Sequence, residues 1–374
     1  MIEQKRLGDI ATYINGFAFK PEDRGTVGLP IIRIQDLTGN AYDLGFYAGN
    51  YPERIEINDG DVLISWSASL GVYVWDKGKA LLNQHIFKVV FDKCEVNREY
   101  FVYAVRYKLK EMESKTHGAT MKHIVKKDFD NTLIPFPTLE EQKNIANLLD
   151  KISTIILVHQ QQLQKLDELV KARFVELFGD PISNPNGWKT EKAEMYIDLC
   201  SGFPFDSSQY TESGVNICGG LIIMPQRIEW NDCKHWCSTE GYEEYTLKKN
   251  DIVIALDRPW ISEGFKIAMV DTEHLPALLI QRTARIRAID INQFYLMYCF
   301  LLGGFDNHCN VTGSLVPHIS AKDIRSFPIM LPPMGLQEQF AAFVEQVDKS
   351  KVAVQKSLDE AQLLFDSLMQ HYFG

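Results

Sequence analysis

The ten residues 133–142, LIPFPTLEEQ, contain the change of pattern that decides the fold. Pro135 and Pro137 punctuate a short apolar stretch, which is typical of an edge strand, because proline has no backbone N–H for a sheet ladder. Thr138 and Glu141 follow at the spacing of a capping box, in which each side chain bonds to the other residue's backbone N–H at a helix start. We therefore expect a strand over 133–137 that stops abruptly before a long helix.

The residues after this junction repeat apolar side chains in steps of three and four, which is the spacing of a coiled-coil seam. His159 and Arg173 are the polar exceptions, and we interpret them as residues that fix the register of the seam. About 40 residues at a rise of 1.5 Å per residue would form a rod of roughly 60 Å. The seam consists of Leu149, Ile152, Ile156, Leu163, Leu166, Val170 and Leu177.

A second stretch with this spacing lies at the C-terminal end of the sequence. Ser350 interrupts it, and the spacing slips by one residue between Val347 and Leu358. Because a rod with one apolar stripe must bury that stripe, we expect each helix to pack on the other. The second seam consists of Phe340, Phe343, Val347, Val354, Leu358, Ala361, Phe365 and Leu368.

Both helices belong to a larger internal duplication, which divides the sequence into units 1–179 and 180–374. Pro137 matches Pro332, and we match Gln142 to Gln339, which makes 334–335 a two-residue insertion. The other matches run in the same order along both units. They pair 14–19 with 200–205, 61–64 with 251–254, 80–84 with 277–281, 118–128 with 313–323 and 178–179 with 373–374.

Each unit begins with a globular part in which short apolar runs alternate with turn residues. We expect strands over 31–34, 61–65 and 87–91, and single helices over 100–110 and 293–302. The sequence therefore predicts an α+β protein with four segments. These are a first globular domain 1–138, a central helix 139–179, a second globular domain 180–333 and a C-terminal helix 334–374.

The composition is that of a soluble globular protein, with 45% hydrophobic and 24% charged residues. We find no apolar run near the roughly 18–20 residues of a membrane span and no apolar signal-peptide core. Seven cysteines without a paired framework fit reduced thiols, so we expect a cytoplasmic protein. The net charge of −10 argues against a sequence-independent DNA coat, because such binding depends on neutralising phosphates.

The junction 134–142, together with 145–146 and 148–150, resembles the corresponding junction in specificity subunits of type I restriction–modification systems. The preceding Gly118-Ala119-Thr120 and the following 177–181 fit the same pattern. The second copy is looser, with Gly313-Ser314-Leu315 at the first of these positions. The resemblance covers essentially the whole chain, including its duplicated order.

This resemblance implies two tandem mixed α/β target-recognition domains, each of which reads one half of an asymmetric bipartite site in double-stranded DNA. The long helices would pair antiparallel as a coiled coil, set the unread spacer and dock methyltransferase subunits. ATP-dependent restriction subunits would bind through the methyltransferase. S-adenosylmethionine, ATP and magnesium would belong to these partners in the prokaryotic cytoplasm, with no cofactor in this chain. The alternative is a helical protein-interaction scaffold without sequence-specific DNA binding.

We expect no catalytic site in this chain. It lacks the Gly-x4-Gly-Lys-Ser/Thr phosphate loop and the Gly-x-Gly-x-x-Gly dinucleotide turn. Residues 184–188, NPNGW, begin like the Asn-Pro-Pro-aromatic tetrad of amino-methyltransferases but lack its second proline, so we interpret them as a turn. Cys233, His235 and Cys237 are the best metal candidate. A zinc site usually needs four ligands, and no convincing second pair exists, so we expect no metal.

Four segments in each unit are candidates for DNA contact. The first is a loop that mixes cationic and hydroxyl donors suited to phosphates, although it could simply be a solvated loop. It contains Lys115, Thr116, Thr120, Lys122, His123 and Lys126, and in the second unit Thr312, Ser314, His318 and Lys322.

The second segment follows a strand and places polar side chains beside an aromatic ring, although the tryptophan could belong to the core. The third consists of Gln84-His85 and Gln281-Arg282, where glutamine suits adenine and arginine suits guanine unless the glutamines are structural. The fourth, 16–20 and 202–205, is a turn with aromatic anchors and Lys20. The second segment comprises Ser65, Trp66, Ser67 and Ser69, and in the other unit Asp257, Arg258 and Trp260.

Overall fold

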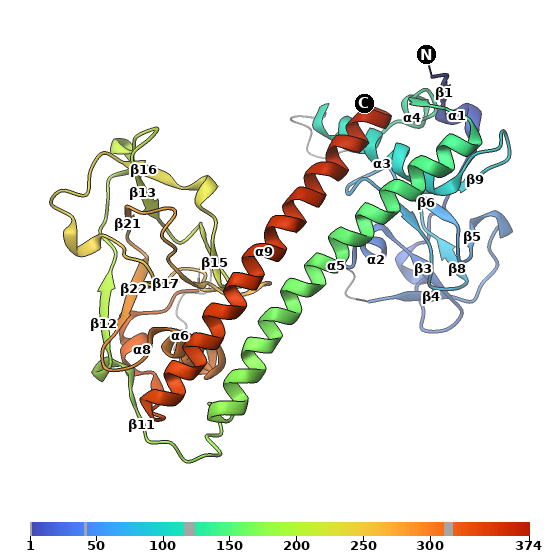
Figure 1. Cartoon of the computed structure of the whole chain (residues 1–374). Helices are drawn as coiled ribbons and strands as arrows, with labels where there is room; N and C mark the ends of the chain where they lie inside the picture. The colour runs from blue at the N-terminus through green and yellow to red at the C-terminus, as the bar shows by residue number, and fades with distance from the viewer. Residues whose placement is uncertain (1, 41–42, 116–123, 310–316) are drawn as a thin grey trace. The chain divides into compact units, whose positions relative to one another are not determined.

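The computed structural model describes residues 2–40, 43–115, 124–309 and 317–374, without the side chains of 114 and 115 (Figure 1). The chain divides into two compact units. Unit 1 comprises Met1–Gln160 and Lys356–Gly374, and unit 2 comprises Gln161–Gln355. Each unit therefore combines one globular part with a portion of both long helices. The expected mixed α/β fold is confirmed.

The globular part of unit 1 contains two four-stranded sheets. One is antiparallel with the order β2-β9-β6-β7, and the other has the order β4-β3-β8-β5 with β3 and β8 parallel. A separate ribbon pairs β1 (Gln4–Arg6) with β10 (Leu133–Pro135). The strands are β2 (Thr12–Asn15), β3 (Leu29–Ile32), β4 (Gly45–Tyr47), β5 (Glu56–Ile57), β6 (Val62–Ser65), β7 (Gly71–Val74), β8 (Ala80–Leu82) and β9 (Ile86–Val90). The helices of this part are α1 (Leu7–Ile10), α2 (Ile34–Thr38), α3 (Arg98–Lys115) and α4 (Lys126–Asp130).

Unit 2 repeats this arrangement, with an antiparallel sheet β12-β22-β17-β20 and a second sheet β16-β13-β21 in which β13 and β21 are parallel. A ribbon again pairs β11 (Thr190–Lys192) with β23 (Pro328–Met330). The strands are β12 (Ile197–Ser201), β13 (Val215–Cys218), β16 (Lys234–Trp236), β17 (Ile252–Ala255), β20 (Ile267–Met269), β21 (Ala277–Leu279) and β22 (Thr283–Ala288). Unit 2 also contains two short hairpins, which are β14 (Ile223–Met224) with β15 (Arg227–Ile228) and β18 (Trp260–Ile261) with β19 (Gly264–Phe265). Its shorter helices are α6 (Gln293–Leu302), α7 (Phe305–His308) and α8 (Ala321–Ser326). The duplication seen in the sequence is thus a duplication of topology.

Most expected elements are present, although several differ at their ends. The helix expected over 100–110 runs over 98–115, and the strand expected over 133–137 ends at Pro135. The helix α6 covers 293–302 as expected, and β6 and β9 begin within one residue of their expected starts. The strand expected over 31–34 ends at Ile32, because a helix begins at Ile34. The Asp36 carboxylate accepts the Arg33 backbone N–H at 2.8 Å and so satisfies a donor at that helix start.

The capping box at the start of the long helix α5 (Leu139–Phe178) is confirmed. The Thr138 backbone N–H donates to the Glu141 carboxylate at 2.9 Å, and the Glu141 N–H donates to the Thr138 hydroxyl at 3.4 Å. The second long helix, α9 (Met334–Phe373), also has 40 residues. The two helices therefore have equal lengths, and 334–335 belong to the first turn of α9.

A buried glutamine fastens each long helix to its globular part. Gln142 accepts the Asn97 N–H and donates to the Pro137 carbonyl, both at 2.9 Å. Gln337 accepts the Asn292 N–H at 2.9 Å and donates to the Pro332 carbonyl at 2.8 Å. The counterpart of Gln142 is therefore Gln337. Our matching to Gln339 and the two-residue insertion are wrong. The pair Glu338-Gln339 has the same letters as Glu141-Gln142, but Gln339 lies two residues after Gln337 and is exposed.

Within unit 2 the two long helices run antiparallel. Asp167 of α5 pairs with Lys351 of α9 at 2.6 Å, and further along α5 the Phe174 ring lies 5.4 Å from Phe340. Phe174 and Phe178, which lie outside the expected seam, are fully buried against Tyr295 of α6. The helix thus packs on the globular core as well as on its partner helix.

The expected seam positions differ in burial. Leu149, Ile152, Val170, Phe340 and Val347 are buried, whereas the others are half-buried. In unit 1, α5 and α9 share a core with α3, to which they contribute Ala146, Leu149, Phe365, Leu368, Met369 and Phe373. Arg173 pairs with Glu176 at 2.7 Å and lies over the Phe343 ring at 5.8 Å. The register role of His159 and Arg173 stays a prediction.

We call Gln142 and Gln337, with the two hydrogen bonds that each makes, the clamp glutamines. Replacing either of them should destabilise its unit. Gln142→Leu or Gln337→Leu would leave a buried N–H and a buried carbonyl without partners, which costs about 1–3 kcal/mol. Denaturant unfolding of the full chain measures this loss. Gln339→Leu is the control, since Gln339 is exposed and its replacement should change the free energy of unfolding by less than about 0.5 kcal/mol. Equal effects at 337 and 339 would contradict the clamp.

Candidate nucleic-acid interface

Three backbone hydrogen bonds join the four candidate segments of unit 1. The Gln84 N–H donates to the Phe17 carbonyl at 2.9 Å, which links the third segment to the fourth. The Trp66 N–H donates to the His85 carbonyl at 3.3 Å, and the Ile124 N–H donates to the Trp66 carbonyl at 3.0 Å. Segments that lie far apart in the sequence therefore meet at one end of the sheet β2-β9-β6-β7.

Unit 2 contains the same three bonds at the matching positions. The Gln281 N–H donates to the Phe203 carbonyl, the Leu256 N–H to the Arg282 carbonyl and the Ile319 N–H to the Leu256 carbonyl, each at 2.9 Å. We call this set of three bonds in each unit the loop frame. It consists of main-chain atoms only, so it does not depend on which side chains the loops carry.

Gly16 and Gly202 allow the closest approach within the loop frame. A Cβ atom at Gly16 would lie 2.0 Å from the Asn83 carbonyl oxygen, and one at Gly202 would lie 1.8 Å from that of Ile280. Both distances are far inside van der Waals contact. These two positions therefore require glycine so that the fourth segment can reach the third.

Two matching positions of the candidate segments have a positive φ in both units without being glycine. His85 and Arg282 have φ values of 71° and 63°, and Ala68 and Arg258 have 59° and 45°. L-residues pay an energy for this conformation, and such strain concentrates at functional sites. Because the matching positions are strained in both units, the strain is a property of the shared loop frame.

In unit 1 the second segment is partly buried. The Trp66 ring stacks on Phe87 with ring centroids 5.6 Å apart and contacts His85 edge-on at 4.9 Å. The expectation that Ser65 and Ser67 face DNA is not supported, because both are buried and the Ser65 hydroxyl donates to the Ser69 carbonyl at 2.5 Å. A strand residue followed by a tight turn explains why these hydroxyls point inward.

Among the expected contacts of unit 1, the exposed side chains are those of Lys20, Ser69, Gln84 and Lys126. His85 is half-buried. Lys126 pairs with Asp130 at 2.8 Å. Among the other expected contacts, Thr116, Thr120, Lys122, His123, Thr312, Ser314 and the side chain of Lys115 lie outside the described residues.

The corresponding surface of unit 2 carries more charge. Arg282 Nη1 lies 2.9 Å from the Asp257 carboxylate, and Gln281, Arg258, His318 and Lys322 are exposed. The remaining expected contact, Trp260, is half-buried and stacks on Phe265 at 5.2 Å, which fits the core interpretation.

Sequence reasoning missed Lys266, which is buried beside this surface. Its ammonium donates to the Gly220 carbonyl, and its backbone oxygen accepts the Ala255 N–H at 3.1 Å. Burial lowers the pKa of Lys266, and the nearby Arg258 lowers it further. Only the pairing of the strands brings Lys266 next to Arg258, so no local sequence signal could have revealed it.

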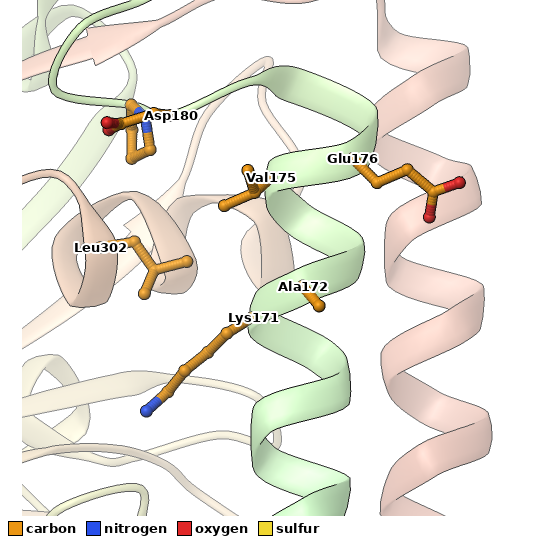
Figure 2. A pocket seen from close by; sticks show the side chains of 7 residues that line it. Lys171, Ala172, Val175, Glu176, Asp180 and Leu302 are labelled. Atoms are coloured by element: carbon orange, nitrogen blue, oxygen red, sulfur yellow. The ribbon is translucent and has the colours of Figure 1, made fainter.

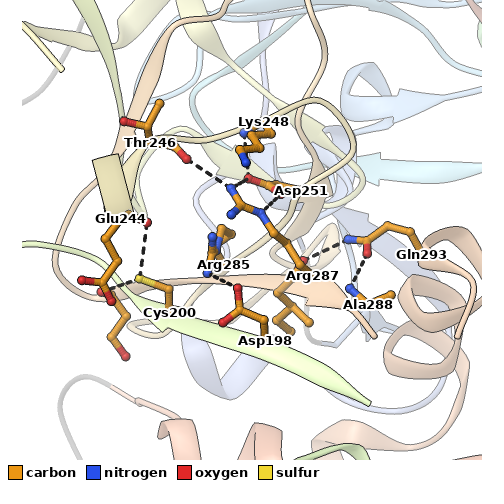
Figure 3. Close-up of polar contacts among 12 residues, drawn as sticks. Asp198, Cys200, Glu244, Thr246, Lys248, Asp251, Arg285, Arg287, Ala288 and Gln293 are labelled. Carbon is orange, nitrogen blue, oxygen red and sulfur yellow. Dashed lines mark hydrogen bonds and ion pairs between the residues drawn. The ribbon is translucent and has the colours of Figure 1, made fainter. Parts of the chain in front are cut away.

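Other charges of the sheets stabilise the fold. Arg287 bonds to both Asp251 carboxylate oxygens at 2.6 and 2.8 Å, and the buried Arg285 bonds to Asp198 at 2.7 Å (Figure 3). The hydrogen bond to Asp251 raises the pKa of Arg287. In unit 1, Lys88 pairs with Asp61 at 2.9 Å. These cations are already neutralised within the fold.

Two further candidate sites lie in unit 2. The Cys233 sulfur lies 3.9 Å from His235 Nε2, and the described residues contain no group of three possible metal ligands. A groove of unit 2 is lined by Lys171, Ala172, Val175, Glu176, Asp180, Pro181 and Leu302 (Figure 2). No helix in the described ranges is long and apolar enough to cross a membrane.

Adding a methyl group at the closest approach should disrupt the loop frame. Gly16→Ala and Gly202→Ala would each force a carbonyl away and should destabilise the chain by about 1–3 kcal/mol. Thermal unfolding measures this effect. Gly335→Ala serves as the control, because nothing lies within 4 Å of a Cβ at that helical position. Unchanged unfolding of both frame variants would contradict the required approach.

The model of the type I restriction modification DNA specificity domain matches residues 2–168 and 237–361. The chain is 30% identical over 409 residues to the EcoBI specificity subunit of Escherichia coli, covering 97% of this chain and 83% of the relative. It is 26% identical over 314 residues to the MjaVIII specificity subunit of Methanocaldococcus jannaschii, covering 79% and 74%.

Solved structures share the fold. An S subunit from M. genitalium aligns with a TM-score of 0.59 at 15% identity, covering 100% of this chain and 96% of that chain. A chain from a study of complex assembly and conformational transition in a type I R-M system aligns with a TM-score of 0.54 at 18% identity, covering 98% and 96%. The family match spans both units, and the chain therefore belongs to the specificity subunits of type I restriction–modification systems.

Proposed function

We propose that the globular part of each unit reads one half of an asymmetric bipartite site in double-stranded DNA. The supporting observation is the loop frame, which recurs in both units while its side chains differ. His85 in one unit corresponds to Arg282 in the other. Two readers with the same backbone and different side chains suit two different half-sites, because base edges are read by side-chain donors and acceptors.

The long helices, in this proposal, fix the distance between the readers and dock methyltransferase subunits. The buried clamps at Gln142 and Gln337 support the first role, because they join each globular part firmly to a helix start. Exposed large apolar side chains on both helices support the second, since such surface commonly marks protein contacts. They include Leu148, Ile155, Leu157 and Leu169 on α5, and Val352, Leu363 and Leu364 on α9.

The chain itself is proposed to be non-catalytic. In this division of labour, S-adenosylmethionine is bound by the methyltransferase subunits, and ATP and magnesium act in the restriction subunits that bind through them. DNA recognition would then be the contribution of this chain to methylation and, where restriction subunits are present, to cleavage in the prokaryotic cytoplasm.

Exchanging one globular part should change one half-site only. A chimera whose residues 1–138 come from another family member should, with its methyltransferase partner, methylate a site with one new half and one unchanged half. Methylation mapping on a randomised DNA library measures this result. Simultaneous change of both halves would contradict the two-reader arrangement. Equal retention of all duplexes by the wild-type complex would instead favour the scaffold alternative.

The isolated chain should have no activity of its own on DNA. Incubation with duplex DNA, Mg²⁺ and labelled S-adenosylmethionine is expected to give neither strand cleavage nor methyl transfer, because in this proposal the catalytic groups belong to the partner subunits. The same mixture with the methyltransferase partner added is the positive control. Methyl transfer or cleavage by the isolated chain would overturn the non-catalytic assignment.

A further inference from the structure

The loop frame allows the two recognition surfaces to be compared position by position. Trp66 and Leu256 both donate to the third segment and accept from a residue within the first, Ile124 or Ile319. The following positions are therefore Ser67 with Asp257, and Ala68 with Arg258, and the positive φ of the latter pair supports this match.

Two more positions match through their backbone partners. Gly71 pairs with Ser65 in unit 1, and Lys266 accepts the Ala255 N–H in unit 2. His85 and Arg282 accept the Trp66 and Leu256 amides. At four adjoining positions, unit 1 thus has serine, alanine, glycine and histidine, whereas unit 2 has aspartate, arginine, lysine and arginine.

The backbones of Arg282 and Asp257 are both held in place. Arg282 follows Gln281, whose amide is bonded to Phe203, and its own carbonyl accepts the Leu256 N–H. Asp257 forms an antiparallel bridge with His318. The Arg282 side chain is 75% exposed, so a long and mobile side chain extends from a fixed base.

Asp257 restricts the mobility of the Arg282 side chain. Its carboxylate lies 2.9 Å from Nη1, and we find no other polar partner of the Arg282 side chain among the described residues. An exposed ion pair of this kind contributes only about 0–1 kcal/mol to stability. The pair therefore contributes little to stability. It orients the guanidinium, and it leaves the N–H groups of Nε and Nη2 available to donate hydrogen bonds to a ligand.

We infer that unit 2 recognises a guanine through Arg282, which Asp257 orients, and that unit 1 makes no such contact. This inference rests on the proposed function and adds the identity of one recognised base. A guanidinium can donate two parallel hydrogen bonds to the O6 and N7 acceptors of guanine, which no other base presents together. The neighbouring Arg258, which is exposed, adds a second cation to this surface in a chain whose net charge is −10.

The test uses the full chain bound to its methyltransferase partner and a duplex library randomised across the recognised site. Methylated molecules are sequenced to give the base preference at every position. The wild-type complex is expected to require guanine at one position that Arg282→Ala relaxes, by roughly tenfold or more. Asp257→Asn should weaken the same preference partially, because the arginine remains but is no longer held.

Two matched variants separate base recognition from folding and charge. Lys192→Ala removes an exposed cation beyond the opposite end of the β12-β22 strand pair and should leave the preference unchanged. His85→Ala alters the matching position of unit 1 and should leave the guanine preference intact. In each variant the unaltered half-site reports that the complex is folded.

Each outcome decides one claim. If Arg282→Ala leaves every base preference unchanged, or relaxes a position that requires another base pair, the guanine assignment is wrong while the two-reader proposal stands. If Asp257→Asn has no effect although Arg282→Ala relaxes guanine, the orienting role of Asp257 is wrong. Absence of any sequence preference in the wild-type complex would overturn the proposed function itself.

Discussion

The recognition surface of each unit depends on one close main-chain approach. At Gly16 and Gly202 the chain lies so near a carbonyl that no side chain fits. This approach brings the fourth segment onto the third, and two further backbone bonds add the second segment and a residue of the first. Since these bonds use only N–H and carbonyl groups, the loops can exchange side chains without losing their shape. Such an arrangement suits the proposed function, in which the two units read different half-sites.

A second constraint links this surface to the helices. Gln142 and Gln337 each bond to a helix start in the globular part and to the proline that ends the preceding segment. Phe174 and Phe178 add a fully buried contact between α5 and the core of unit 2. A reader attached in this way cannot swivel freely about its helix, which is what a fixed spacer between two half-sites would require.

The sequence predicted the regular and repeated features well, because their signals are local. The capping box at Thr138, the helix 293–302 and the apolar spacing of α5 and α9 depend on neighbouring residues. The match of Gln84 with Gln281 also agrees with the structure, because their N–H groups donate to the matching residues Phe17 and Phe203.

The features that depend on tertiary packing could not be predicted in this way. Ser65 resembles an exposed loop hydroxyl until its strand buries it, and Lys266 reaches Arg258 only through strand pairing. The error at Gln339 arose because we matched identical letters, Glu-Gln, and did not keep a constant difference in residue number between the two helices. The residue with the same contact as Gln142 is Gln337, two residues earlier.

The central claim is that two similar frames read two different half-sites. Sequencing of the positions methylated by the wild-type complex, on a fully randomised duplex library, tests this claim most directly. The account predicts two specified segments of different sequence, separated by unspecified bases of constant number. A single continuous site, or two identical halves in a palindrome, would contradict it.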